Sequence, residues 1–230
     1  MQIRGLQKLT LLDYPEKVAC TIFTGGCNLR CPFCHNASLV IGPNKGGMIS
    51  EMAITSFLKQ RRGLLDGVCV TGGEPLLHRD IADFLRPIKA LGYLVKLDTN
   101  GSFPDQLKEL VTRKLIDYVA MDIKSSPEQY EKAAGVSRGD FSRIRDSIDY
   151  LLGEPVDYEF RTTVVKGLHD AEIMQDLAQT IRGAKRYYLQ TFVDSGDLIG
   201  TGMSAFSEGD MHRFLDVVSP YVNMAALRGL

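Results

Sequence analysis

The sequence lacks an excess of either charge. Its 230 residues include 27 Lys and Arg against 28 Asp and Glu, so that the formal net charge is -1. Nucleic-acid binding depends largely on a field of basic side chains that neutralises phosphates. Because this sequence has no such field, we expect no nucleic acid among the partners of the protein, and a large RNA substrate is disfavoured.

Long apolar segments are missing as well. No segment approaches the roughly 20 apolar residues of a membrane span, and the first residues, Met1 to Gly5, do not contain the apolar core of a signal peptide. The cysteines are five, an odd number with three of them clustered, which suits a reducing compartment better than a framework of disulfides. We therefore expect a cytoplasmic protein that does not associate with membranes.

No linker-like or low-complexity segment interrupts the chain, so residues 1–230 are expected to form a single domain. Apolar segments of strand length alternate with longer segments of helical period. Strands are expected at 18–23, 67–71, 93–98, 117–123, 158–165, 186–191 and, briefly, 222–225; helices are expected at 50–62, 81–91, 104–114, 127–152 with a break near 135–139, 170–182 and 208–218.

Six successive β-then-α repeats indicate an α/β fold with a parallel sheet and right-handed crossovers. The length of the chain suits a curved sheet of six strands better than the roughly 250 residues typical of a closed eight-stranded barrel.

Three cysteines stand close together directly after the first predicted strand. Cys27, Cys31 and Cys34 have C-x3-C-x2-C spacing and follow Gly25-Gly26. Three sulfur atoms in so short a turn bury little surface, which favours metal ligands over packing residues. A structural zinc site needs four protein ligands, whereas a four-iron cluster is usually held by one thiolate per iron. The pattern therefore permits a zinc knuckle completed by a histidine such as His35, or a four-iron cluster with one iron open for chemistry.

Unusual polar and glycine residues follow the other predicted strands, and the carboxyl ends of parallel strands are where active sites gather. They include Thr71-Gly72-Gly73-Glu74-Pro75, Asp98-Thr99-Asn100-Gly101, Asp122-Ile123-Lys124, Lys166 to His169 and Gln190 to Phe192. Each has a plainer interpretation, such as a turn, a solvated acid or a surface lysine. Arg161 interrupts an apolar strand, so it is expected to pair with one of these acids or with the carboxylate of a ligand.

The cysteine motif resembles that of radical S-adenosylmethionine (SAM) enzymes. Phe33 before the third cysteine, His35-Asn36 after it and Leu11 to Pro15 upstream make the chain similar to the enzymes that activate glycyl-radical enzymes. The likeness is nearest to the activating proteins of anaerobic ribonucleotide reductases, and pyruvate formate-lyase activases are also similar. It implies an open (βα)6 partial barrel with the radical SAM core.

The resemblance implies that Cys27, Cys31 and Cys34, in a cluster loop at 25–36, hold a [4Fe–4S] cluster whose open iron binds SAM. Reductive cleavage of SAM would give a 5′-deoxyadenosyl radical that abstracts hydrogen from a glycine of the partner enzyme. The chemistry is then carried by the cofactors, and no side chain is expected to be catalytic. The expected partners are a glycyl-radical enzyme, with anaerobic ribonucleotide reductase preferred, and an electron donor such as flavodoxin or ferredoxin.

The resemblance also assigns the residues at the strand ends. The SAM contacts it implies are Gly72, Gly73, Glu74, Asp98, Lys124 and Arg161, with Glu74 and the neighbouring backbone receiving the amino group of SAM. A monovalent cation beside the SAM carboxylate would have as its ligands Asp98, Thr99, Ala120 and Asp122. Cys20 and Cys69 are expected as small apolar side chains inside strands, and the histidines at 78, 169 and 212 as ordinary surface or loop residues.

Two alternatives remain at this point. One is a radical SAM enzyme that acts on a small molecule, as the deazapurine carboxylate synthases do. The other, from a different class, is a zinc-binding interaction module.

Overall fold

The computed structural model describes residues 1–42, 47–137 and 141–229. Within it the chain divides into two compact units, which are described separately. The first unit comprises Met1–Asn28, Ser38–Thr99 and Phe103–Val119, and the second comprises Leu29–Ala37, Asn100–Ser102 and Ala120–Leu230.

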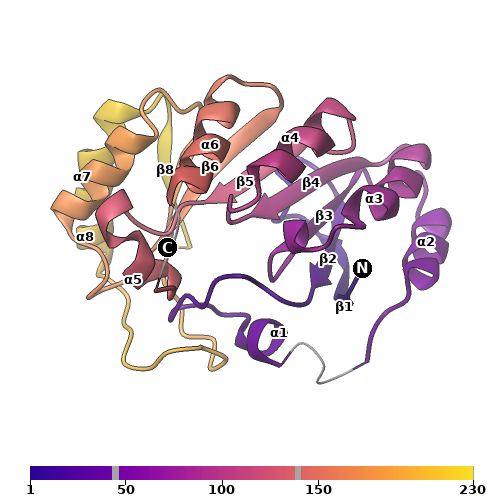
Figure 1. Ribbon diagram of the computed structural model, residues 1–230, viewed down its shortest axis with the longest axis horizontal. Helices are drawn as coiled ribbons and strands as arrows, with labels where there is room; N and C mark the ends of the chain where they lie inside the picture. Colours follow the sequence, from indigo (N-terminus) through magenta and orange to yellow (C-terminus); the bar gives the residue numbers. More distant parts are fainter. Residues whose placement is uncertain (43–46, 138–140, 230) are drawn as a thin grey trace. The chain divides into compact units, whose positions relative to one another are not determined.

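The first unit is built on parallel strands with one antiparallel strand added (Figure 1). β2 pairs in parallel with β3 and β3 with β4, whereas β1 runs antiparallel to β2. The sequence did not predict β1. The elements are β1 (Ile3–Thr10), β2 (Ala19–Thr24), α1 (Ala37–Ile41, entered from the second unit at Ala37), α2 (Glu51–Gln60), β3 (Gly67–Gly72), the 3-10 turn η1 (Pro75–Leu77), α3 (Ile81–Ala90), β4 (Leu94–Thr99), α4 (Pro104–Thr112) and the start of β5 (Tyr118–Asp122).

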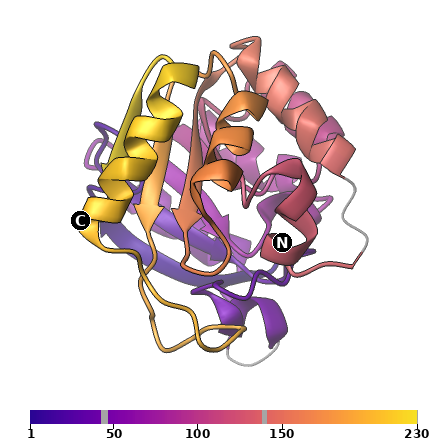
Figure 2. The ribbon, with the colours of Figure 1, turned by 90° about the vertical axis from the view of Figure 1, so that its left-hand side faces the viewer.

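The second unit continues the alternation of strands and helices. β6 pairs in parallel with β7, and β7 with β8. Figure 2 shows α7 and α8 side by side over these strands. After the end of β5 come η2 (Pro127–Gln129), α5 (Tyr130–Ala134), α6 (Phe141–Leu152), β6 (Asp157–Val164), α7 (Ala171–Thr180), β7 (Tyr187–Thr191), α8 (Glu208–Val218), η3 (Ser219–Tyr221) and β8 (Ala225–Arg228).

The helix boundaries have local causes. α2 begins after Ser50, whose hydroxyl accepts a hydrogen bond from the Ala53 amide at 3.2 Å. α8 begins with a capping box in which Ser207 and Asp210 satisfy each other's backbone amides. α5 ends at Gly135, which adopts the left-handed conformation with φ 66°. The helix predicted at 127–152 does break at Gly135, as expected near 135–139. Residues 138 and 139 of that predicted break lie outside the described residues.

A buried ion pair joins β6 and β8, which both pair with β7 in the second unit. The carboxylate of Glu159 in β6 is fully buried and accepts two hydrogen bonds from the guanidinium of Arg228 in β8, at 2.6 and 2.8 Å. The guanidinium carbon of Arg228 lies 3.3 Å from the centroid of the Tyr188 ring on β7. This fork-shaped pair and the stacking contact tie β8 to its neighbours.

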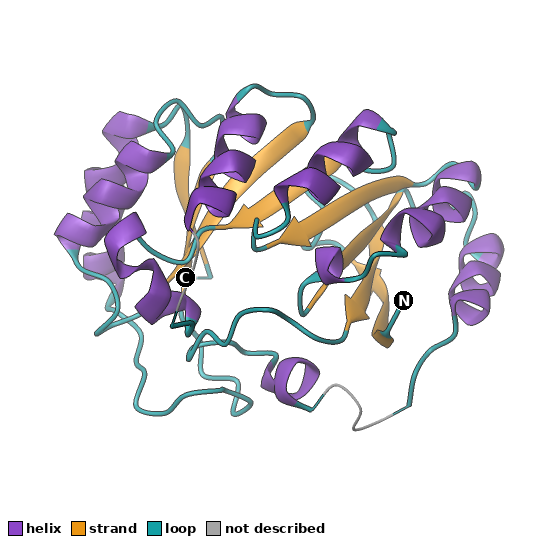
Figure 3. Cartoon of the chain, in the orientation of Figure 1, coloured by secondary structure: helices purple, strands orange, loops and turns teal. Residues whose placement is uncertain are grey.

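The six strands that the sequence predicted are present, each with both ends within one residue of its predicted position. The short strand predicted at 222–225 is shifted and forms β8 instead. Figure 3 shows the alternation of helices and strands that defines the α/β class. Within the described ranges, the structure contains no helix with the length and apolar character required to cross a membrane.

Candidate functional site

Gly72 at the end of β3 and Gly73 after it let the start of the cluster loop approach closely within the first unit. Glu74 N donates to Gly26 O at 2.8 Å, and Gly73 N donates to Thr24 O at 2.9 Å. A Cβ atom at Gly73 would lie 1.9 Å from Gly26 O, and one at Gly72, where φ is 111°, would lie 2.5 Å from the Thr24 backbone. Both positions therefore require glycine for the close packing of the backbone, independently of their predicted role in binding SAM.

Glu74 is held by its own surroundings. Its side chain is buried, and Oε1 accepts hydrogen bonds from the Leu76 amide at 3.0 Å and from the Thr99 hydroxyl at 2.8 Å. The first of these bonds caps the short turn η1, which Pro75 opens. Glu74 and Thr99, which the sequence assigned to SAM and to a cation respectively, thus share a hydrogen bond at the ends of β3 and β4.

Asp98 near the end of β4 has an internal cation as its partner. The Nζ atom of Lys96, a buried side chain, forms an ion pair with Asp98 Oδ1, and Cys69 Sγ lies 3.8 Å from the same oxygen. Lys96 was not among the residues predicted for the site. The sequence pattern that could have revealed it is an isolated lysine between apolar residues, two positions before Asp98 and therefore on the same face of the strand.

In the second unit, Asp122 lies between two cations. Arg161 Nε donates to Asp122 Oδ1 at 2.8 Å, and Lys124 Nζ lies 3.2 Å from Asp122 Oδ2. Burial acts to raise the pKa of Asp122, but the attraction of Arg161 and Lys124 outweighs burial and holds that pKa well below its usual range. Arg161 was expected to pair with a strand-end acid or with the carboxylate of a ligand, and in the structure it pairs with the acid Asp122.

Two of the predicted cluster ligands also lie near Lys124. Burial acts to lower the pKa of Lys124, but its electrostatic interactions with Asp122 and, to a smaller extent, with Cys31 and Cys34 leave that pKa raised. The pKa of His35 is lowered, first by burial and then by repulsion from Lys124. Within the second unit, Cys31, Cys34 and His35 therefore lie near the charged side chains of Asp122, Lys124 and Arg161.

His169 fixes the backbone at Lys124. It is buried, its Nδ1 accepts from the Val165 amide at 3.0 Å, and its Nε2 therefore carries the proton that it donates to Lys124 O at 2.9 Å. Burial lowers the pKa of His169 and favours this neutral form. His169 lies in the loop after β6, as expected, but it is buried and not at the surface, because composition does not reveal the fold of that loop. His212, by contrast, is exposed, and His78 is half-buried with Nε2 3.0 Å from Gly25 O.

The second half of the cluster loop is held between two glycines of the second unit. Arg30 N donates to Ala134 O at 2.9 Å, and a Cβ atom on Gly135 would lie 2.0 Å from Arg30 O. Gly200 N donates to Pro32 O at 2.7 Å, and a Cβ atom there would lie 2.7 Å from Pro32 Cβ. Sequence reasoning missed both glycines, because nothing local connects them with a loop more than 100 residues earlier.

The three clustered cysteines form no disulfide, and neither do Cys20 and Cys69, which are fully buried in β2 and β3 as expected. Among the residues that the structure describes, no three His, Cys, Asp or Glu side chains are gathered as a metal site. Cys27 belongs to the first unit, and Cys31 and Cys34 belong to the second. The cluster ligands, the SAM contacts and the cation ligands accordingly remain predictions. The donor set itself suits an iron–sulfur cluster, since thiolates are its usual ligands.

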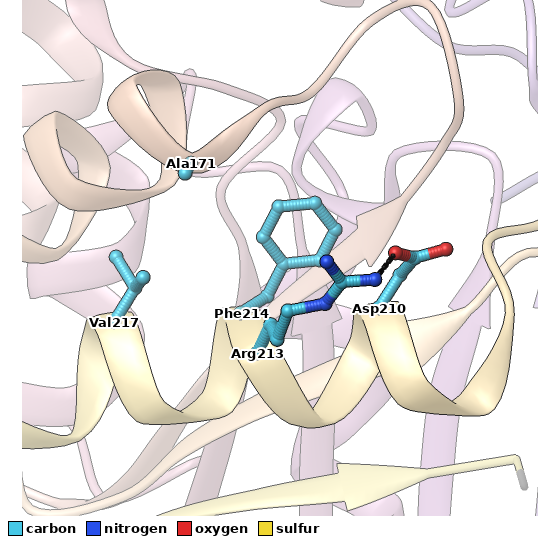
Figure 4. A pocket seen from close by; sticks show the side chains of 5 residues that line it. All are labelled: Ala171, Asp210, Arg213, Phe214 and Val217. Carbon is cyan, nitrogen blue, oxygen red and sulfur yellow. Dashed lines mark hydrogen bonds and ion pairs between the residues drawn. The ribbon is translucent and has the colours of Figure 1, made fainter.

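A pocket lies elsewhere in the second unit, at the start of α7 and along α8 (Figure 4). Its volume is about 170 Å³, and its lining is mainly apolar apart from the ion pair of Asp210 with Arg213. It contains none of the residues that the sequence predicted for the site.

The family model described as "Radical SAM superfamily" matches residues 21–179. The chain belongs to the radical SAM superfamily. The matched segment begins in β2 and includes all three clustered cysteines. As a radical SAM enzyme, the protein uses a [4Fe–4S] cluster and SAM, which confirms these two predicted cofactors; the monovalent cation stays a prediction. The family assignment favours this centre over the zinc-binding module.

Two curated relatives and one solved protein illustrate the likeness. A Methanocaldococcus jannaschii protein, named provisionally as a glycyl-radical enzyme activating enzyme, is 31% identical over 98% of this chain and 95% of its own length. The 7-carboxy-7-deazaguanine synthase of Methanospirillum hungatei is 30% identical over 63% of this chain and 58% of its own length.

Crystal structures of Streptococcus suis SuiB, one bound to SAM and another to its precursor peptide SuiA, give TM-scores of 0.70 and 0.72 at 17% identity. They cover 89% and 91% of this chain, which spans about half of the SuiB chain. Together with the alternation of strands and helices, this likeness confirms the predicted radical SAM α/β fold.

Proposed function

We propose that this radical SAM enzyme is an activating enzyme that generates a glycyl radical on a partner protein, with anaerobic ribonucleotide reductase as the expected partner. The observation that carries the proposal is the M. jannaschii relative, because the likeness to it covers nearly the full length of both chains. The likeness to 7-carboxy-7-deazaguanine synthase leaves more than a third of each chain unmatched.

In this proposal the three clustered cysteines are the cluster ligands, and the strand ends hold SAM. Lys124 and Arg161 supply the positive charge that suits the SAM carboxylate, since their charges together exceed that of the Asp122 between them. Gly72, Gly73 and Glu74 receive the amino group, and Asp98 completes the set at the end of β4. When bound, the cluster and SAM supply the one-electron cleavage and the adenosyl radical that takes a hydrogen atom from glycine.

Side chains in this scheme orient the cofactors and keep water away. His169 contributes by fixing the backbone of Lys124, so that the ammonium at the end of β5 keeps its place. We expect the electron to come from a flavodoxin or ferredoxin and the reaction to occur in the cytoplasm.

A second candidate is a radical SAM enzyme that acts on a small molecule. The 30% identity to 7-carboxy-7-deazaguanine synthase over 160 residues favours it. This candidate would use the same cluster and SAM residues, so SAM cleavage alone does not separate the two functions.

The test combines the anaerobically reconstituted protein with SAM, dithionite and the purified anaerobic ribonucleotide reductase of the same organism. The expected result is a SAM-dependent glycyl-radical signal in electron paramagnetic resonance, which disappears when the radical glycine of the reductase is replaced by alanine. Cleavage of SAM without any radical on the reductase would exclude this partner. Formation of 7-carboxy-7-deazaguanine in an extract supplied with the enzyme would support the second candidate.

The ligand assignment has its own test. Cys31→Ser and Cys34→Ser are expected to lose bound iron and SAM cleavage, because each removes one of three thiolates. Cys20→Ala is the matched control, since Cys20 is fully buried inside β2 and outside the cluster motif. A Cys31→Ser protein that retained a full cluster and cleaved SAM would remove this residue from the ligand set.

A further inference from the structure

Lys96 is a lysine buried where a strand would ordinarily carry an apolar side chain. It lies in β4 with 1% of its surface exposed, between the buried Val95 and Leu97. A buried ammonium is costly unless an anion and further hydrogen-bond acceptors surround it. Its position in the first unit therefore calls for a specific partner.

That partner is Asp98, two residues further along the same strand. Residues two apart project from the same face of a strand, and the Nζ atom of Lys96 forms an ion pair with Asp98 Oδ1. On the adjacent strand Cys69, the register neighbour of Lys96, places its Sγ atom 3.9 Å from Nζ. The ammonium is thus enclosed by a carboxylate and a sulfur atom that come from β3 and β4 alone.

Asp98 is also the residue to which the resemblance assigns a bound monovalent cation. A lysine ammonium is a compact point charge, and it already contacts the carboxylate that such a cation would need. In the second unit the other acid of that expected set, Asp122, is likewise engaged, by Arg161 at 2.8 Å and Lys124 at 3.2 Å. Each carboxylate of the set has a cation that belongs to the chain.

We propose that Lys96 is the resident cation at Asp98, so that this protein binds no monovalent metal ion there and cleaves SAM without requiring one. Asp98, Thr99, Ala120 and Asp122 then serve the structure and SAM binding, and are not cation ligands. The inference rests on the proposed SAM site and is independent of which molecule receives the radical.

The first test measures thermal unfolding of the cluster-free protein in KCl, NaCl and choline chloride at equal ionic strength. The wild-type midpoint is expected to be the same in all three salts. Lys96→Met removes the ammonium group beside Asp98. The midpoint of thermal unfolding of this variant is expected to be about 2–4 °C higher in KCl or NaCl than in choline chloride, because a metal ion bound at Asp98 now stabilises the folded state.

Two further variants keep this test decisive. Lys89→Met is the matched control, because Lys89 in α3 also forms an ion pair within the first unit, with Asp117 at 2.6 Å, and neither residue belongs to the expected cation ligands. It is expected to lose stability equally in all three salts. If Lys96→Met alone does not fold, the double variant Lys96→Met/Asp98→Asn removes both charges and is expected to fold with no preference among the salts.

The second test measures 5′-deoxyadenosine formation by the reconstituted wild-type enzyme with dithionite and no partner protein. Equal rates in potassium, sodium and choline salts are expected. A wild-type midpoint or rate that rises specifically with potassium or sodium would overturn the proposal, and so would a folded Lys96→Met protein with no salt preference. Neither result bears on the glycyl-radical partner, which is tested separately.

Discussion

Gly135→Ala should disturb the cluster loop from a position outside the cysteine motif. Gly135 ends α5 with φ 66°, and a Cβ atom there would meet the Arg30 backbone at 2.0 Å from the oxygen and 2.5 Å from the carbonyl carbon. Because these are backbone atoms, no rotation of a side chain can relieve the contact. Either the end of α5 or the backbone between Arg30 and Cys31 has to move.

The size of the effect follows from two contributions. A left-handed conformation costs a residue with a Cβ atom about 1–2 kcal/mol. Forcing an extra carbon into a packed site costs a further 1–3 kcal/mol or so. Gly135→Ala should therefore destabilise the cluster-free protein by about 2–5 kcal/mol, and displacement of the Arg30–Cys31 backbone should lower the iron bound per chain after reconstitution.

Gly183→Ala separates the two contributions. Gly183 also has a left-handed φ of 84°, but a Cβ atom there would meet nothing within 4 Å. It should cost about 1–2 kcal/mol and leave the iron content unchanged. Unfolding in urea and iron and sulfide analysis after anaerobic reconstitution measure both quantities. Equal losses of stability and equal iron contents in the two variants would show that the cluster loop does not depend on Gly135.

Two further predictions concern the second unit. Because the pKa of His169 is lowered in the folded protein, the unfolded chain binds a proton that the folded chain does not, and the free energy of unfolding should fall as the pH drops below about 6.5. Urea unfolding measured from pH 7 to pH 5 should show a smaller fall for His169→Gln than for the wild type. Equal falls would contradict this role of His169. Arg228→Ala leaves the fully buried Glu159 carboxylate without its guanidinium and should cost about 3–5 kcal/mol. Glu159→Gln should lower the free energy of unfolding by less, because Arg228 is partly exposed and keeps its contact with Tyr188. A larger loss for Glu159→Gln than for Arg228→Ala in urea unfolding would be evidence against this account.

The parallel strands could be predicted because both of their faces are covered. In β3, Val68, Cys69 and Val70 are all fully buried, so that the strand reads as a continuous apolar segment. β1 has no such pattern. It is antiparallel, and its Gln7 to Leu9 segment is exposed, which makes its residues resemble a loop. The sequence of this strand gives little sign that it extends the sheet.

The charged residues of the candidate site could be predicted in part for a similar reason. Strand ends in a parallel sheet expose polar side chains at one edge, and an arginine inside a buried strand must find an acid, as Arg161 does with Asp122. Lys96 follows the same rule and was overlooked, although its partner lies only two residues away. His169 and Gly200 could not have been found, because their roles depend on loops whose course no local pattern determines.

The support of the cluster loop by Gly135 and Gly200 has a consequence for biosynthesis. Arg30 and Pro32 form their hydrogen bonds with residues that the ribosome adds much later, at Ala134 and Gly200. At about 5–20 residues per second, roughly 10–30 s separate the synthesis of the third cysteine from that of Gly200. Throughout that interval the nascent segment that carries Cys31 and Cys34 lacks these two backbone supports. We therefore expect stable binding of iron and sulfide only after nearly the whole chain has been made.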